Sequence, residues 1–269
     1  MSPMSQRIRS YLETSYSLAK AGVCPSSILL WPLRRRLPPA RNQLVLKNGI
    51  SILSPPEEPL LHIFKEIWID CSYLNGRPET HRAWTVVDIG ANVGVFALWV
   101  TTRNPLARVI CVEPSPRTCE FLRRNISKNK LNNVTVVQAA CGGKSGEADL
   151  YCRGVAAMDT LYCQDNYGSK FHLVAKIAVL TLQDLFEQFD VQVCNLLKLD
   201  CEGAEYEILF NASGDALDRV EAITMEYHVG LNEYTPDQLT RFLESRGFSV
   251  KQTPLLDEEG GYLYATKQS

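Results

Sequence analysis

An apolar run, a glycine turn and a second apolar segment follow one another between Val86 and Phe96. Asp88 lies near the end of the run, and Gly90 and Gly94 lie in the turn. This order predicts a buried parallel strand, a tight turn and a helix that packs back on the strand. Glycine permits a close ligand, and the free N–H groups at a helix start can receive a carboxylate or phosphate. The segment therefore predicts a site for a nucleotide-like ligand.

Segments typical of strands alternate with segments typical of helices from Trp84 onward. Strands are predicted at 86–89, 109–112, 134–139, 194–199 and 220–225, and helices at 94–101, 116–128, 203–210 and after the cap Thr235. We expect 146–179 to form an inserted set of strands or a hairpin, and 248–252 with 261–266 to form a terminal antiparallel pair. The pattern predicts an α/β, Rossmann-like fold with a mostly parallel sheet and helices on both faces.

The residues before this alternation have a different organisation. A helical pattern occupies the first part, 44–53 alternates around Lys47-Asn48-Gly49 as a hairpin would, and 56–70 shows one apolar helical face. We therefore divide the chain into an N-terminal helical and hairpin extension, residues 1–80, and a larger α/β domain, residues 81–269.

Charge and cysteine usage narrow the class of protein. The net charge of −2 gives no positive field for nucleic acid. The nine cysteines contain no C-x-x-C pair, which favours free, mostly buried thiols in a reducing cytosol. The start lacks an apolar signal core, and no 18-residue apolar span follows. We expect a cytoplasmic protein without integral membrane association, and a homo-oligomer is possible.

The turn favours S-adenosylmethionine over a dinucleotide. Its pattern, D-x-G-x-N-x-G, comprises Asp88, Gly90, Asn92 and Gly94, and it lacks the G-x-G-x-x-G spacing of dinucleotide sites. An acid at the strand end would repel a pyrophosphate but suits a cationic ligand. S-adenosylmethionine carries an ammonium and a sulfonium beside its carboxylate, so we expect it as the cofactor.

Two later strand ends extend the predicted cofactor site. Glu113 ends the second strand roughly 20 residues past the turn, where a carboxylate can accept both ribose hydroxyls. Pro114 stops that strand. The alternative is that Glu113 is a solvated strand-end acid. Gln138 and Ala140 lie near the end of the third strand, where backbone N–H groups or the Gln138 side chain could contact adenine.

A second group of charged residues predicts the reaction site. Strand periodicity places Lys198, Asp200 and Glu202 on one side of the strand that ends there, where open α/β sheets bind ligands. The next strand brings Glu226 and His228 to the same edge of the sheet. A structural salt-bridge cluster is the alternative for the first three, and His228 could equally be structural.

Five motifs together resemble the FkbM family of methyltransferases. They are V-V-D-I-G-A-N-V-G, V-E-P-S-P, L-T-L-Q-D-L, L-K-L-D-C-E-G-A-E and M-E-Y-H, and the likeness runs from about Phe64–Trp68 to the C-terminus. The resemblance implies a class I methyltransferase-like fold and S-adenosylmethionine-dependent methylation of a hydroxyl on a small natural product, sugar or glycan. It also implies cofactor roles for Asp88, Gly90, Asn92, Gly94 and Glu113, with Asp200 at the rim of the active site.

Methyl transfer requires the acceptor oxygen, methyl carbon and sulfur to be aligned, and a base helps to remove the hydroxyl proton. We assign that base to His228 or Asp200 and the positioning of the acceptor to Lys198 or Glu202. A divalent metal held by Asp200, Glu226 and His228 is possible but not favoured, because the same acids are explained without it.

The acceptor is not identified by the sequence. The irregular segment 151–171 carries Tyr151, Met158, Tyr162, Tyr167 and Phe171, and it could select the substrate or be an ordinary surface insertion. Two other functions stay open: a non-catalytic S-adenosylmethionine- or nucleotide-binding scaffold and, less favoured, a nicotinamide-dependent oxidoreductase.

Overall fold

The glycine turn joins β3 (Thr85–Ile89) to α4 (Val95–Arg103) in the computed structural model of the chain, as the sequence predicts. The structure describes residues 3–29, 42–73, 83–152, 159–162, 171–254 and 260–268.

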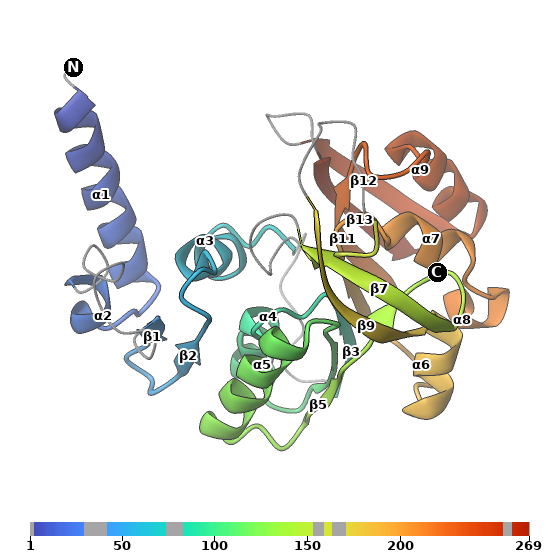
Figure 1. Cartoon of the computed structure of the whole chain (residues 1–269), viewed down its shortest axis with the longest axis horizontal. Helices are drawn as coiled ribbons and strands as arrows, with labels where there is room; N and C mark the ends of the chain where they lie inside the picture. The colour runs from blue at the N-terminus through green and yellow to red at the C-terminus, as the bar shows by residue number, and fades with distance from the viewer. Residues whose placement is uncertain are drawn as a thin grey trace.

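A seven-stranded sheet forms the centre of the molecule (Figure 1). Its order is β12-β13-β11-β10-β3-β4-β5. The further strands are β4 (Arg108–Val112), β5 (Val134–Val137), β10 (Leu196–Leu199), β11 (Ala222–His228), β12 (Phe248–Pro254) and β13 (Gly260–Lys267). The strands from β11 to β5 are parallel, and β13 pairs antiparallel with both β11 and β12. The predicted class I methyltransferase-like fold with its terminal hairpin is confirmed.

The two faces of the sheet bury different residues of each strand. Val87 and Ile89 of β3 pack with α6–α9, whereas Val86 packs with α4 and α5, because successive side chains of a strand point to opposite faces. Figure 1 shows the two helix groups on opposite sides of the strands. The remaining helices are α5 (Pro116–Lys128), α6 (Leu182–Gln188), α7 (Glu205–Phe210), α8 (Gly214–Asp218) and α9 (Pro236–Ser245).

Capping residues set several helix starts. Thr181 and Thr235 both form capping boxes, as their spacing to Asp184 and Gln238 favours. The short helix α8 was not expected from the sequence; it begins where the Ser213 hydroxyl accepts the N–H of Ala216.

The N-terminal part contains α1 (Pro3–Lys20), α2 (Pro25–Leu29), the predicted hairpin β1 (Gln43–Val45) with β2 (Ser51–Leu53), and α3 (Leu60–Phe64), which continues as a π-helical segment, Lys65–Ile69. Phe64, Trp68 and Tyr73 belong to the same buried cluster as α4. The Trp68 indole N–H donates to the Val95 carbonyl at 3.2 Å. The end of the predicted extension therefore packs directly on the α/β domain.

The inserted strands form a separate four-stranded sheet of order β6-β9-β7-β8. Its members are β6 (Ala140–Cys141), β7 (Gly146–Cys152), β8 (Asp159–Thr160) and β9 (His172–Leu180). The strand predicted at 134–139 ends at Val137, because the chain then leaves the central sheet to pair with β9. Met158 and Tyr167 lie outside the described residues.

Eight cysteines in the described part of the chain are free thiols, and five of them are buried, as predicted; Cys163 lies outside that part. Among the described residues, the helices are too short or too polar to cross a lipid bilayer.

Candidate functional site

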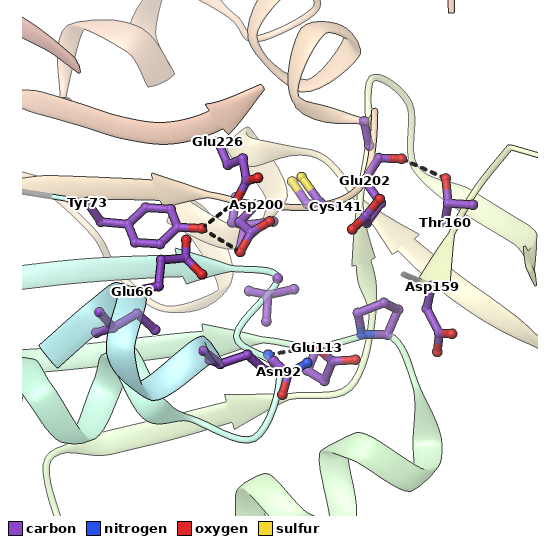
Figure 2. A pocket seen from close by; sticks show the side chains of 18 of the residues that line it. Glu66, Tyr73, Asn92, Glu113, Cys141, Asp159, Thr160, Asp200, Glu202 and Glu226 are labelled. Atoms are coloured by element: carbon purple, nitrogen blue, oxygen red, sulfur yellow. Dashed lines mark hydrogen bonds between the residues drawn. The ribbon is translucent and has the colours of Figure 1, made fainter. Parts of the chain in front are cut away.

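A cavity of about 590 Å³ opens at the carboxyl ends of β3, β4, β10 and β11 (Figure 2). The chain runs from β3 outward through β4 to β5 and then returns to the other side of β3 with β10 and β11. Open α/β sheets bind ligands at such a reversal of strand order. One side of the cavity, the turn end, is formed by Gly90, Asn92, Glu113, Pro114 and Ala140, and the other, the acidic end, by Glu66, Tyr73, Asp200, Glu226 and Tyr262.

Gly90 connects the two ends through the backbone. Its φ is +76°, and a Cβ at this position would lie 1.6 Å from the Asp200 carbonyl oxygen. Gly90 is therefore required by the packing of β10 against the turn. At Gly94, whose φ is +86°, a Cβ would lie 2.5 Å from the side chain of Leu122 on α5. The packing of the protein itself therefore requires glycine at both positions, whether or not a ligand binds.

Glu113 is held on the cavity wall by two backbone N–H groups. One carboxylate oxygen accepts the N–H of Asn92 at 2.9 Å (Figure 2), and the other accepts that of Ser115 at 2.9 Å. Burial raises the pKa of Glu113 to about 8, although these hydrogen bonds oppose the shift. A carboxylate has about four acceptor positions, so the two that remain can receive hydroxyl groups of a ligand.

Lys198 lies beneath the cavity, opposite Asp88 in the pairing of β10 with β3. Its ammonium is 3.1 Å from Asp88 Oδ1 and 3.5 Å from Asp200 Oδ2, and it donates to the Gly90 carbonyl at 3.2 Å. Burial alone would lower the pKa of Lys198, but the Asp88 and Asp200 carboxylates raise it. The side chains of Lys198 and Asp88 are 2% and 0% exposed, so this ion pair is a buried one.

Tyr73 joins two carboxylates at the acidic end. Its hydroxyl lies 2.9 Å from Asp200 Oδ2 and 2.9 Å from Glu226 Oε2 (Figure 2). The Tyr262 hydroxyl donates to Glu66 Oε1 at 2.8 Å. Burial and the Asp200 carboxylate raise the pKa of Glu226 to about 8 and also raise that of Glu66. The acidic end thus places three carboxyl groups close enough to affect one another's protonation.

The loop after β10 is braced by Glu205. This buried carboxylate accepts the N–H groups of Cys201 at 2.8 Å and Gly203 at 2.9 Å. His228 Nδ1 lies 3.1 Å from Glu205, and its Nε2 lies 3.7 Å from Glu202. Burial by itself lowers the pKa of His228. The Glu202 and Glu205 carboxylates outweigh this effect and raise that pKa well above its ordinary value. The protonated imidazole then acts as a cation that ties β11 to this loop.

The structure brings eight of the predicted site residues to the cavity wall. They are Gly90, Asn92, Glu113, Pro114, Ala140, Asp200, Glu202 and Glu226. The other predicted site residues do not line the cavity. Asp88 and Lys198 lie beneath it, Gly94 lies at the start of α4, and His228 lies behind Glu202. The Gln138 side chain accepts a hydrogen bond from Arg123 at 3.0 Å. The functional roles of all these residues stay predictions.

Glu66, Tyr73 and Tyr262 were not expected at the site from the sequence. The first two precede the α/β domain, and the third is in the terminal hairpin, so no local motif links them to Asp200. The sequence offered one indication of a role for Glu66: it lies in the segment where the resemblance to the FkbM family begins. The inserted sheet also reaches the cavity through Thr160, whose hydroxyl donates to the Glu202 carbonyl at 2.7 Å.

Asp200, Glu226 and His228 each offer an atom within 4.8 Å of the others, which is close enough for a shared cation. Each of them already has protein partners: Tyr73 for the two acids and Glu205 for the histidine. The grouping is therefore explained without a metal.

The carboxylates that line the cavity are chemically suited to S-adenosylmethionine. Glu113, at the turn end, offers free acceptor positions for ribose hydroxyls, and carboxylates suit the ammonium and sulfonium charges. The volume lies within the range of small-molecule sites. The residues present fit the cofactor.

Comparison with known proteins also indicates a methyltransferase. Residues 88–250 match the family described as Methyltransferase FkbM domain. Methyltransferase 1 of Beauveria bassiana is 30% identical over 77% of this chain and 89% of its own length. Hexuronic acid methyltransferase AglP of Haloferax volcanii is 27% identical over 64% of this chain and 66% of its own length. 31-O-demethyl-FK506 methyltransferase FkbM of Streptomyces tacrolimicus is 23% identical over 79% of this chain and 91% of its own length.

Proposed function

We propose, from the premise that this chain belongs to the FkbM family of methyltransferases, that it methylates a hydroxyl group of a sugar or another small natural product. One observation carries the proposal: a single cavity joins Glu113 at the turn end to Asp200 and Glu226 at the acidic end. The names of two relatives, a hexuronic acid methyltransferase and a 31-O-demethyl-FK506 methyltransferase, support a hydroxylated acceptor.

The turn end would hold the cofactor. Glu113 would accept ribose hydroxyls, while Asn92 and Pro114 would line the nucleoside and Ala140 the adenine. When bound, S-adenosylmethionine supplies a methyl group whose bond to sulfur breaks as a bond to the acceptor oxygen forms, leaving S-adenosylhomocysteine. Placement of the cofactor at this end leaves the acidic end for the acceptor.

Asp200 is the better of the two predicted bases. It lines the cavity with a 30% exposed side chain, whereas His228 lies behind Glu202 and is held protonated by two carboxylates. A base must be within hydrogen-bond reach of the proton that it removes. Asp200 would take the acceptor's hydroxyl proton, and Glu202 and the inserted sheet near Thr160 would contact the rest of the acceptor.

Calorimetric titration with S-adenosylmethionine and S-adenosylhomocysteine tests the cofactor end. We expect micromolar binding, weakened about 10- to 100-fold in Glu113→Ala, because a charge-assisted hydrogen bond contributes about 1.5–3 kcal/mol. Glu120→Ala, which removes an exposed acid from α5, is the matched control. Absence of binding at millimolar ligand would refute the proposal and favour a scaffold without cofactor.

A screen of sugars and hydroxylated small molecules tests the acceptor. Formation of S-adenosylhomocysteine should require an acceptor with a free hydroxyl, and mass spectrometry should find the new methyl group on oxygen. Methylation of nitrogen or carbon in every productive acceptor would contradict this part of the proposal.

A further inference from the structure

Tyr73 has one hydroxyl proton and faces three carboxyl groups, Asp200, Glu226 and Glu66, and the first two contact its oxygen most directly. Asp200 Oδ2 and Glu226 Oε2 both lie 2.9 Å from its oxygen, which is hydrogen-bond distance in each case. An ionised carboxylate can only accept, so two ionised partners cannot both be satisfied by one O–H group. Both contacts are hydrogen bonds only if one of the carboxyl groups carries a proton and donates it to the tyrosine oxygen.

The surrounding charges identify which carboxyl group is neutral. Asp200 Oδ2 lies 3.5 Å from the buried Lys198 ammonium, which favours the ionised form of Asp200. Glu226 faces Asp200, Glu66 and the hydroxyls of Tyr73 and Tyr262, and its cationic neighbour is His228. That imidazole is already engaged by Glu202 and Glu205. Glu226 therefore has the weaker support for a negative charge.

We infer that Glu226, Tyr73 and Asp200 form a directed hydrogen-bond chain, in which neutral Glu226 donates to Tyr73 and Tyr73 donates to ionised Asp200. Tyr73 and Glu226 are positioning residues, and Asp200 is the catalytic base of the proposed function on which this inference rests. The contacts with Tyr73 and Lys198 occupy Oδ2, so Oδ1 is the oxygen that receives the acceptor's proton.

The direction of the chain has a chemical consequence. In transfer, the proton leaves the acceptor oxygen for Asp200 Oδ1 while that oxygen gains the methyl group, and the proton passes to solvent after the product leaves. Because Glu226 is neutral, Asp200 is the single ionised member of the chain.

Isosteric amide variants distinguish the two acids. The side-chain amide introduced by Glu226→Gln can still donate to Tyr73, so this variant should lose at least tenfold less turnover than Asp200→Asn. Asp200→Asn removes the base and should reduce turnover about 100-fold or more. Binding of S-adenosylhomocysteine reports whether each variant folds. If Glu226→Gln binds this ligand normally but is as inactive as Asp200→Asn, the direction is wrong.

Tyr73→Phe tests the positioning role. The hydroxyl of Tyr73 donates to the ionised form of the proposed base, and its loss makes that form less favourable, so the acidic limb of the kcat/KM profile should move to higher pH. We also expect kcat to fall about tenfold, with the KM for S-adenosylmethionine unchanged. Tyr206→Phe, which removes a buried hydroxyl from α7 outside the cavity lining, is the control. An unmoved acidic limb in Tyr73→Phe would overturn the positioning role.

Infrared spectroscopy tests the proton without any acceptor. Wild-type protein near pH 6.5 should show the carbonyl band of a neutral carboxylic acid that Glu226→Gln removes and Glu221→Gln, an exposed control, keeps. A spectrum in which Glu226→Gln removes only carboxylate bands overturns the inference even if methyl transfer is found. Conversely, failure of every acceptor in the screen refutes the proposed function and leaves the infrared result to decide the protonation of Glu226.

Discussion

The turn end of the cavity comes from backbone and side chains at the ends of adjacent strands, whereas the acidic end comes from side chains on widely separated segments. Glu113 is fixed by N–H groups only 2 and 21 positions away in the sequence. Tyr73 contacts Asp200 and Glu226 across 127 and 153 positions. The first end can form as soon as neighbouring strands pair, but the second requires the complete tertiary structure.

The two ends also raise the pKa of a glutamate by different means. Glu113 has its pKa raised by burial against the opposition of two N–H donors. For Glu226, the Asp200 carboxylate adds to burial. A single buried carboxylate suits fixed recognition of hydroxyls, whereas interacting carboxyls suit proton transfer, since each changes the protonation of the other.

Lys198→Met should reduce the stability of the fold more than the other substitutions. The Lys198 ammonium contacts the turn end through the Gly90 carbonyl and the acidic end through Asp200. The substitution leaves the fully buried Asp88 without its cation, which we expect to destabilise the fold by about 3–5 kcal/mol in urea unfolding. Lys65→Met breaks an ion pair with Asp70, in which both side chains are 44% exposed, and should cost at most about 1 kcal/mol. Similar small losses in both variants would show that Lys198 does not join the two ends.

Gly90→Ala should disrupt the turn end next most strongly. Its Cβ would meet the Asp200 carbonyl oxygen in a left-handed backbone conformation, for a combined cost of about 2–4 kcal/mol. Gly49→Ala is the control, since Gly49 has a φ of +90° but no atom within 4 Å of the added Cβ. It should lose only about 1–2 kcal/mol. Equal losses in thermal unfolding would mean that the contact with Asp200 is not what requires glycine.

Glu226→Gln should alter the pH dependence of stability by a smaller amount. The folded state holds the Glu226 proton more tightly than the unfolded state, so its stabilisation is complete below about pH 4.5 and is lost as pH rises toward 8. The variant should therefore lose less stability between pH 5 and 8, by on the order of 1 kcal/mol. Urea unfolding across this range, with Glu221→Gln as control, measures the slope. An unchanged slope in Glu226→Gln would contradict the raised pKa.

Local sequence patterns were sufficient for the sheet and the turn end. The strand and helix periodicities gave the positions of β3, β4 and α5, and the helix cap Thr235 was recognisable because a cap involves residues a few positions apart. Glu113 and Asp200 were placed near one cavity because the carboxyl ends of parallel strands meet at the same edge of a sheet.

The sequence by itself determined the family, the α/β fold and the residues at the strand ends, since each depends on short-range spacing. The tertiary structure alone decided that Lys198 points beneath the cavity toward Asp88 and that His228 is occupied by Glu205. It also decided that Glu66, Tyr73 and Tyr262 complete the acidic end. Contacts across more than a hundred residues depend on how helices and strands pack, and this packing leaves no periodic signal in the chain.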